Sequence, residues 1–238
     1  MSGHSTWNNI KRTKEKSDAQ KGKIFTKIGR EIAVAVKDGG ADPTTNNRLK
    51  DVIAKARQNN MPNDSIQRAI KKASGDLAGV TFENIVYEGY GAGGAAVIVD
   101  CLTDNKNRTA GDVRHAFDKF GGSLGANGCV SYLFKRKGII FIEKNGQDAD
   151  ELMMAALEAG ARDIIEDENS FIIETAPEEI HSVQENLEKA GYTIDQSDVE
   201  LVPDMYVELE ENKAGSFERM VEMLEDLDDV QNVYHNVK

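Results

Sequence analysis

The spacing of apolar residues changes near residue 80, and this change constrains the fold more than any other feature of the sequence. Before it, the segments 23–37, 42–58 and 62–74 repeat apolar residues at the interval of an amphipathic helix. After it, short runs rich in β-branched residues alternate with further helical segments. The chain has 238 residues, which is enough for two or three compact domains. The sequence therefore predicts the α+β class, with an N-terminal helical bundle followed by two α/β domains.

The second half of the chain contains a complete pattern of alternating strands and helices. The elements expected there are strand 139–143, helix 149–159, strands 163–166 and 171–174, helix 177–190 and a strand from 193 onward. This βαββαβ order is typical of the ferredoxin-like fold. We therefore expect a ferredoxin-like domain at 135–203.

The segments on either side of that domain are incomplete without each other. Residues 81–132 contain two strands around a glycine-rich hairpin, then a helix from Thr109 to Phe120 with Thr109 in its capping box. After Pro203, the pattern predicts a strand at 205–210, a helix at 215–227 and a strand at 230–234. We expect this tail to complete the sheet of 81–132, so that the ferredoxin-like domain is inserted in the other α/β domain. The predicted domains are 1–79, 80–134 joined with 204–238, and 135–203.

Charge is divided unevenly along the chain, although the net charge of −12 is acidic. Residues 1–80 contain 16 lysines and arginines against 8 acids, whereas residues 141–238 contain 6 against 27. A basic head on an acidic body suggests a polyanionic partner at one end of the molecule. The acidic body would be repelled by that partner and would orient the molecule on it.

The helix expected at 23–37 has two faces of different chemistry. With residues placed at 100° steps from Ile24, the apolar side chains fall at roughly 0–120° and the cations at roughly 220–300°. The cations are Lys23, Lys27, Arg30 and Lys37. Cations in such a row displace counterions from phosphates, so we predict that this face binds nucleic acid; the alternative is an ordinary solvated face. The next helix adds the candidate contacts Arg48, Lys50 and Arg57.

Two other segments carry candidate contacts to nucleic acid. The N-terminal arm contains the single tryptophan, Trp7, which either stacks on an unpaired base or anchors the arm to the bundle. The polar loop at 103–109 either contacts phosphate or serves only as a capping turn before the next helix. The candidate cations of these segments are Lys11, Arg12, Lys14, Lys106, Arg108 and Arg114.

No group of residues in the sequence is typical of an enzyme. The histidines and the cysteines Cys101 and Cys129 lack the spacing of metal ligands, and no serine lies in a nucleophile elbow. The glycine-rich run 89–94 has the GxGxxG spacing, but a strand follows it, so we expect a hairpin rather than a dinucleotide site. Two cysteines without a CxxC pair fit a reducing compartment, and no apolar run is long enough to span a membrane. We expect a cytoplasmic, non-enzymatic protein with no metal or cofactor and no membrane partner.

Several short motifs along the chain carry a family resemblance. They are Gly3-His4-Ser5 with Trp7, Phe25-Thr26-Lys27, Arg30-Glu31-Ile32, Asn60-Met61-Pro62, Tyr87-Glu88-Gly89-Tyr90-Gly91, and Thr103-Asp104-Asn105 with Asn107-Arg108-Thr109. In this order they resemble the YebC/PmpR family, which includes the mitochondrial translational activator of cytochrome c oxidase. The resemblance implies a helical N-terminal domain and two α/β domains, one inserted in the other.

The resemblance also implies a binding function. Family members are described as transcriptional regulators that bind promoter DNA, or as ribosome-associated factors that bind ribosomal RNA and relieve stalled translation. We therefore predict a nucleic-acid-binding regulator of gene expression whose partner is promoter DNA or ribosomal RNA, the latter on the ribosome. The alternatives are a protein-interaction module, or a nuclease that holds Mg²⁺ through Glu88, Asp100 and Asp104.

Overall fold

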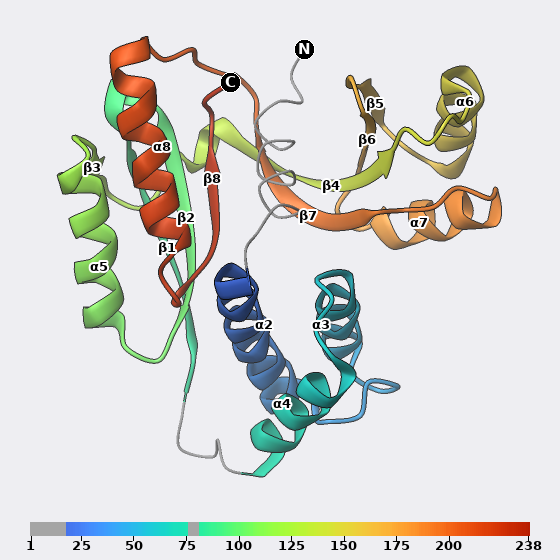
Figure 1. The fold of residues 1–238 in the computed structure, drawn as a ribbon, viewed down its shortest axis with the longest axis horizontal. Coiled ribbons are helices and arrows are strands. Elements are labelled where there is room, and N and C mark those ends of the chain that lie inside the picture. The colour runs from blue at the N-terminus through green and yellow to red at the C-terminus, as the bar shows by residue number, and fades with distance from the viewer. Residues whose placement is uncertain (1–17, 76–80) are drawn as a thin grey trace. The chain divides into compact units, whose positions relative to one another are not determined.

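The computed structural model describes residues 18–75 and 81–238 (Figure 1). The described residues fall into two compact units. One unit, here called the bundle–sheet unit, contains 18–75, 81–131 and 209–235, and the ferredoxin-like unit contains 132–208 and 236–238. The first unit is therefore built from two stretches of chain with the second inserted between them. The bounds of the three predicted domains stay a prediction.

Three helices form the N-terminal bundle: α2 (Asp18–Gly39), α3 (Asn47–Gln58) and α4 (Asn63–Gly75). Their apolar stripes meet in one core, in which Ile32, Leu49 and Ile66 are almost completely buried. This arrangement confirms the expected bundle, because each helix can bury its stripe only against the other two.

Helix α3 begins later than the expected residue 42, and that part of the prediction is wrong. Asn46 caps the helix: its Oδ1 accepts from the Leu49 backbone N–H at 3.0 Å, and its Nδ2 donates to the carbonyl of Ala35 at 2.7 Å. Asp42 instead accepts from the backbone N–H of Thr44 at 2.9 Å in the preceding turn. The pKa of Asp42 is lowered, chiefly by the hydroxyl hydrogen bond from Thr44.

A four-stranded sheet follows in the same unit, in the order β3-β1-β2-β8. Its strands are β1 (Glu83–Tyr90), β2 (Ala96–Thr103), β3 (Ser123–Leu124) and β8 (Val230–His235). The short 3₁₀ turn Ala92–Gly94 joins β1 to β2, which confirms the glycine hairpin. The tail contributes β8, which pairs antiparallel with β2 although about 130 residues separate them in sequence.

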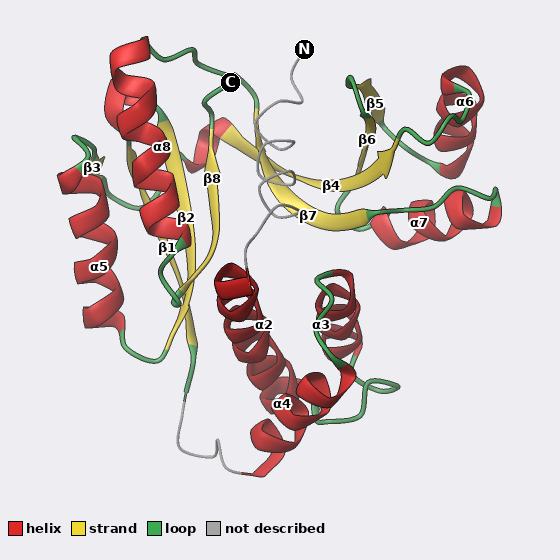
Figure 2. Cartoon of the chain, viewed as in Figure 1, coloured by secondary structure: helices red, strands yellow, loops and turns green. Residues whose placement is uncertain are grey.

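Two helices, α5 (Lys106–Lys119) and α8 (Glu211–Glu225), lie on one face of this sheet (Figure 2). Two glycines, one in β1 and one in the hairpin after it, make room for these helices. A Cβ at Gly89 would meet Phe117 of α5, and one at Gly91 would meet Phe217 of α8. Helix α5 begins before the expected Thr109, because Asn105 is its cap. The expected strand at 205–210 is absent, and only a single bridge between Val207 and Val237 occurs there.

The ferredoxin-like unit has the expected βαββαβ order. Its elements are β4 (Phe134–Glu143), α6 (Ala149–Ala159), β5 (Asp163–Glu166), β6 (Ser170–Thr175), α7 (Ile180–Lys189) and β7 (Gln196–Pro203), preceded by a 3₁₀ turn at Ser131–Leu133. The strands pair antiparallel in the order β5-β6-β4-β7. Leu152 of α6 and Leu187 of α7 are buried with Ile140 on one face of the sheet. The opposite face carries a second apolar cluster around Phe141.

Candidate nucleic-acid interface

The cationic face of α2 is partly buried. Val34 lies on the same side of the helix as Lys27, Arg30 and Lys37, and only 9% of it is exposed. The Arg30 side chain is 17% exposed. This face therefore packs within the bundle–sheet unit, in contrast to the open row of cations that the sequence suggested.

The partner of this face is the acidic turn, defined here as residues 225–229, which joins α8 to β8. Lys23 Nζ lies 2.9 Å from Asp226 Oδ1, and Lys27 Nζ donates to the carbonyl oxygen of Glu225 at 2.7 Å. Arg30 Nη1 donates to the carbonyl oxygen of Asp228 at 2.8 Å. Cations from successive turns of α2 thus all contact the acidic turn. Lys37, further along, donates to Thr81 Oγ1 at 3.1 Å.

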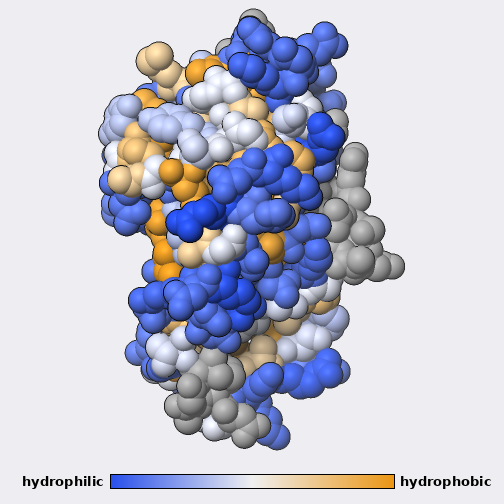
Figure 3. Space-filling view, turned by 90° about the vertical axis from the view of Figure 1, so that its left-hand side faces the viewer, coloured by the Kyte–Doolittle hydropathy of each residue, from blue (hydrophilic) through white to orange (hydrophobic). Residues whose placement is uncertain are grey.

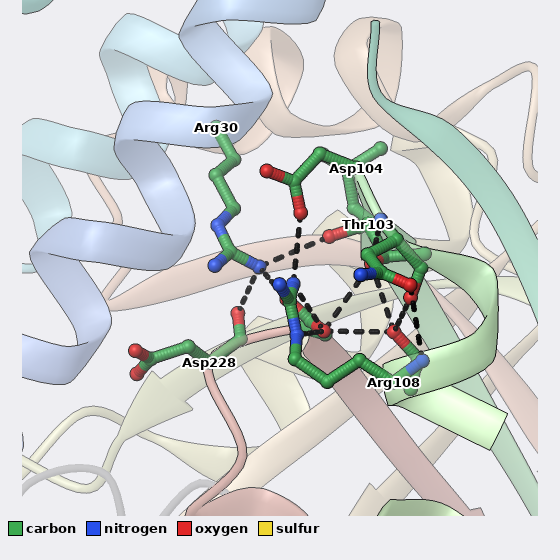
Figure 4. A network of polar contacts seen from close by, with 9 residues as sticks. Arg30, Thr103, Asp104, Arg108 and Asp228 are labelled. Atoms are coloured by element: carbon green, nitrogen blue, oxygen red, sulfur yellow. Dashed lines mark hydrogen bonds and ion pairs between the residues drawn. The ribbon is translucent and has the colours of Figure 1, made fainter. Parts of the chain in front are cut away.

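Figure 4 shows a polar network that includes Arg30, Thr103 and Arg108, and the buried carboxylate of Asp229 is its centre. Its carboxylate accepts hydrogen bonds from Arg30 Nη1, from Nε and Nη2 of Arg108, and from the hydroxyls of Thr103 and Thr109. Burial alone raises the pKa of Asp229, but the bonds from Thr109, Arg108 and Arg30 outweigh it and hold the pKa below its ordinary value. The network therefore joins the bundle, the β2–α5 loop and the acidic turn around one ionised carboxylate.

The loop at 103–109 serves this network and also caps α5. Asn105 Oδ1 accepts from the backbone N–H of Arg108 at 3.1 Å, and Thr103 Oγ1 accepts from the backbone N–H of Asn105 at 2.9 Å. Arg108 also contacts Asp104 at 2.8 Å, and Lys106 forms an ion pair with Glu83. The motif that carried part of the family resemblance thus has a structural role here. A phosphate contact by Lys106, Arg108 or the exposed Arg114 stays a prediction.

A cavity of about 360 Å³ opens beside the network. It is lined by Arg30 and Arg108, Leu227 and Thr109, and the carboxylates of Asp104, Asp112, Asp228 and Asp229. Because the carboxylates outnumber the guanidinium groups, the cavity does not suit a phosphate.

Helices α3 and α4 carry four cations that are open to solvent. Within residues 18–75 and 81–238, the side chains of Lys50, Arg57, Lys71 and Lys72 form no ion pair or hydrogen bond, and all four are exposed. We call these four residues the open cations. Arg68, also exposed, donates within its own helix, to Ser65 Oγ and the Asp64 carbonyl.

Two other cations of α3 are already paired inside the bundle. Arg48 lies 2.6 Å from Asp38, with both side chains about half exposed, and Lys55 lies 3.0 Å from Glu31. The candidates Trp7, Lys11, Arg12 and Lys14 lie outside the described residues. Of the site residues that the sequence predicted, Lys50, Arg57 and Arg114 are exposed and form no ion pair or hydrogen bond within residues 18–75 and 81–238. Lys71 and Lys72 of α4 are open in the same way.

The carboxylates of the alternative nuclease site have other surroundings. Among the described residues, no three histidine, cysteine or acidic side chains are placed to hold a metal ion. Glu88 instead accepts from the backbone N–H groups of Gly128, Val130 and Ser131 at 2.8–2.9 Å. Burial raises the pKa of Glu88, but these bonds outweigh it and lower the pKa. Glu88 thus fixes the loop that follows β3.

The acidic turn was not predicted from the sequence as the partner of α2. One signal was present: Val34 falls near 280° on the helical projection, in the middle of the cations. A large apolar residue within a cationic stripe indicates a face that packs against protein. No large apolar side chain lies among the exposed residues of α4, which include Gln67, Arg68, Lys71 and Lys72.

The protein is of the α+β class, with a cationic helical bundle followed by two four-stranded antiparallel sheets. Comparison with known proteins gives its family. Residues 5–76 match the TACO1/YebC N-terminal domain, and residues 82–237 match the second and third domains of the same family. The chain belongs to the TACO1/YebC family, which confirms the resemblance found in the motifs.

Relatives and a solved structure agree over nearly the whole chain. A protein of Hathewaya histolytica, named a probable transcriptional regulatory protein, is 58% identical over 239 residues that cover 100% of this chain and 97% of the relative. One of Acetivibrio thermocellus with the same description is 58% identical over 99% of this chain and 98% of the relative. The crystal structure of the conserved hypothetical protein Aq1575 from Aquifex aeolicus is 47% identical, with a TM-score of 0.84 over 94% of this chain and 92% of that one. No helix in the described part of the chain is long and apolar enough to cross a membrane.

Proposed function

We propose that this chain is a non-enzymatic regulator of gene expression that binds nucleic acid through α3 and α4 of its bundle. The open cations carry the proposal, because they are exposed lysines and arginines with no protein partner among the described residues. The names of the relatives, probable transcriptional regulatory proteins, support a regulatory role.

The remaining charge of the molecule favours one orientation on the nucleic acid. The bundle segment 18–75 contains 12 lysines and arginines against 6 acids, whereas residues 141–238 contain 6 against 27. A phosphate backbone attracts the first segment and repels the second. On the face of the molecule drawn in Figure 3, hydrophilic residues predominate, with hydrophobic residues between them.

We further propose that structured RNA, as on the ribosome, binds at least as well as duplex DNA. The open cations lie on two helices, which suits an irregular phosphate surface better than a single groove. As a recognition helix in a DNA groove, α4 would offer few side chains that can contact base edges, chiefly Asn63, Gln67 and Arg68. The names of the relatives favour the second candidate, which is a transcriptional regulator bound to promoter DNA.

The test replaces all four open cations with glutamine and measures affinity for structured ribosomal RNA and for duplex DNA over a range of salt concentrations. Each lost phosphate contact should lower the slope of log affinity against log salt by roughly one unit, and affinity should fall by about tenfold or more at low salt. A control variant carries the same change at Lys119, Arg162, Lys189 and Lys213, which lie outside the bundle.

The outcomes are distinct. A parent-like slope in the variant would place the phosphate contacts elsewhere and reject α3 and α4. An equal loss in the control variant would show that only net charge matters. Duplex DNA that competes orders of magnitude better than ribosomal RNA at equal salt, with the protein at the top of a sedimentation gradient of cell extract, would favour the transcriptional alternative.

A further inference from the structure

Helix α6 of the ferredoxin-like unit is apolar on two sides. Leu152 and Ala156 are completely buried against the sheet. On the other side, Met153, Met154 and Leu157 are 38%, 65% and 56% exposed. We call these three residues the α6 apolar stripe.

The stripe is not needed to build the core of its own unit. The alanines Ala149, Ala155 and Ala159 complete the contact of α6 with the core, and no residue of the stripe belongs to it. Only seven large hydrophobic side chains are exposed among the residues that the structure describes, and three of them lie on this one helix. Large apolar side chains that gather on a surface mark a contact site more often than scattered ones do.

The surroundings of the stripe are acidic. Asp150, Glu151 and Glu158 are exposed on the same helix, which carries no lysine or arginine. The residues 132–208 that form most of the unit contain 19 acids and 6 lysines and arginines. This charge repels nucleic acid and anionic lipid alike, so the bundle's partner is not the occupant.

An occupant therefore has to offer apolar side chains surrounded by cations. A basic amphipathic helix combines the two, and flexible methionine side chains adapt well to such a helix. A second copy of this chain does not offer one from its described helices. The basic helix α4 buries its apolar residues Ile66 and Ile70 inside the bundle.

We infer that the α6 apolar stripe docks a basic amphipathic helix of a protein partner. This inference does not depend on the proposed nucleic-acid contact, which lies on other helices. It gives the acidic unit a binding function: while the bundle holds nucleic acid, α6 holds a basic protein segment.

The first experiment measures binding of a defined probe to the full chain by calorimetry. The probe is a synthetic amphipathic peptide of leucine and lysine, about 18 residues or five helical turns long. The double variant M154Q/L157Q removes apolar surface without changing charge. The control M205Q changes a methionine that is 72% exposed elsewhere in the same unit. We expect about a tenfold or larger rise in Kd for the double variant and none for the control.

Four results would overturn the inference. Equal affinity of the double variant would show that the stripe is not the site. Equal binding of a leucine–glutamate peptide would remove the role of charge. Sedimentation that depends on protein concentration in the parent but not in the double variant would make a second copy the occupant. A lowered melting temperature of the double variant would make the stripe part of the folded core.

A second experiment identifies what touches the stripe in cells. A photoreactive residue at position 153 is cross-linked, and the attached peptides are sequenced. Cross-linked peptides that are basic and repeat apolar residues at helical spacing support the inference. Cross-links to nucleic acid, to acidic peptides or to the chain itself contradict it.

Discussion

Helices α2 and α4 both place cations opposite an apolar stripe, yet the two sets of cations have different surroundings. On α2, Lys23, Lys27 and Arg30 are bound to the acidic turn. On α4, Lys71 and Lys72 have no side-chain partner among the described residues. A cationic stripe in a sequence therefore indicates a charged partner, but it does not tell whether that partner is another molecule or another part of the same chain.

The energetic roles of the two surfaces should differ accordingly. Burial of Arg30 and Asp229 in one network makes them important for folding, because an ionised group left alone in that position loses water without compensation. The open cations remain hydrated, so they contribute little to stability and are available for phosphates.

The largest effect is expected from Asp229→Ala. It removes the carboxylate that accepts from Arg30, Arg108 and the hydroxyl of Thr109, and we expect the unfolding free energy to fall by about 3 kcal/mol. Urea denaturation of the full chain measures this, with hydrogen exchange in β8 to locate the loss. The neighbouring Asp228→Ala is the control, since Asp228 is exposed and contributes its backbone carbonyl to Arg30. Equal stability of the two variants would contradict a role for the buried carboxylate.

The open cations should show the reverse behaviour. The quadruple glutamine variant should lose nucleic-acid affinity by about tenfold or more, while its unfolding free energy stays within about 0.5 kcal/mol of the parent. An Arg30→Gln variant should lose stability and keep its affinity per folded molecule. Loss of both properties in either variant would break the division between the two surfaces.

Stability should fall in acid through Asp229 and Glu88. Both have a pKa lowered in the folded state, so their contribution is present above the ordinary values of 3.8 and 4.5 and is lost as pH falls through the folded pKa. We expect the urea midpoint to drop below about pH 4 and to vary less steeply with pH in Asp229→Asn and Glu88→Gln. The quadruple glutamine variant, which removes no carboxylate, should keep the parent's slope. A slope unchanged by both carboxamide variants would assign acid sensitivity to other groups.

Much of the fold could be predicted because it follows from local periodicity. Each helix or strand must bury one face, and the spacing of its apolar residues shows which kind of element can do so. This spacing predicts both the three bundle helices and the βαββαβ order. The start of α3 was placed wrongly because Asp42 and Asn46 are equally good caps by residue type. The bonds from Asn46 Nδ2 to the carbonyls of Ala35 and Gly40, which the residue types do not reveal, favour the later start.

The candidate site was less predictable because it depends on contacts between distant residues. Arg30 and Asp229 are 199 positions apart, and nothing in the local sequence pairs them. The tail's strand β8 carries the acidic turn beside the bundle only once it pairs with β2. A non-local strand pairing therefore decided which of two similar cationic stripes stays open.

The smallest effect is expected from Lys23→Gln. The pair of Lys23 with Asp226 is solvent-exposed, with 41% and 64% of the side chains accessible. An ion pair in such a position contributes less than about 1 kcal/mol, because water and salt screen it. We expect a change in unfolding free energy near the limit of detection, and a nucleic-acid affinity equal to that of the parent. Lys71→Gln, an equal change of charge on an open helix, should weaken binding several-fold. If Lys23→Gln weakened binding as much as Lys71→Gln, α2 would contribute to the interface in solution and the acidic turn would have to move aside.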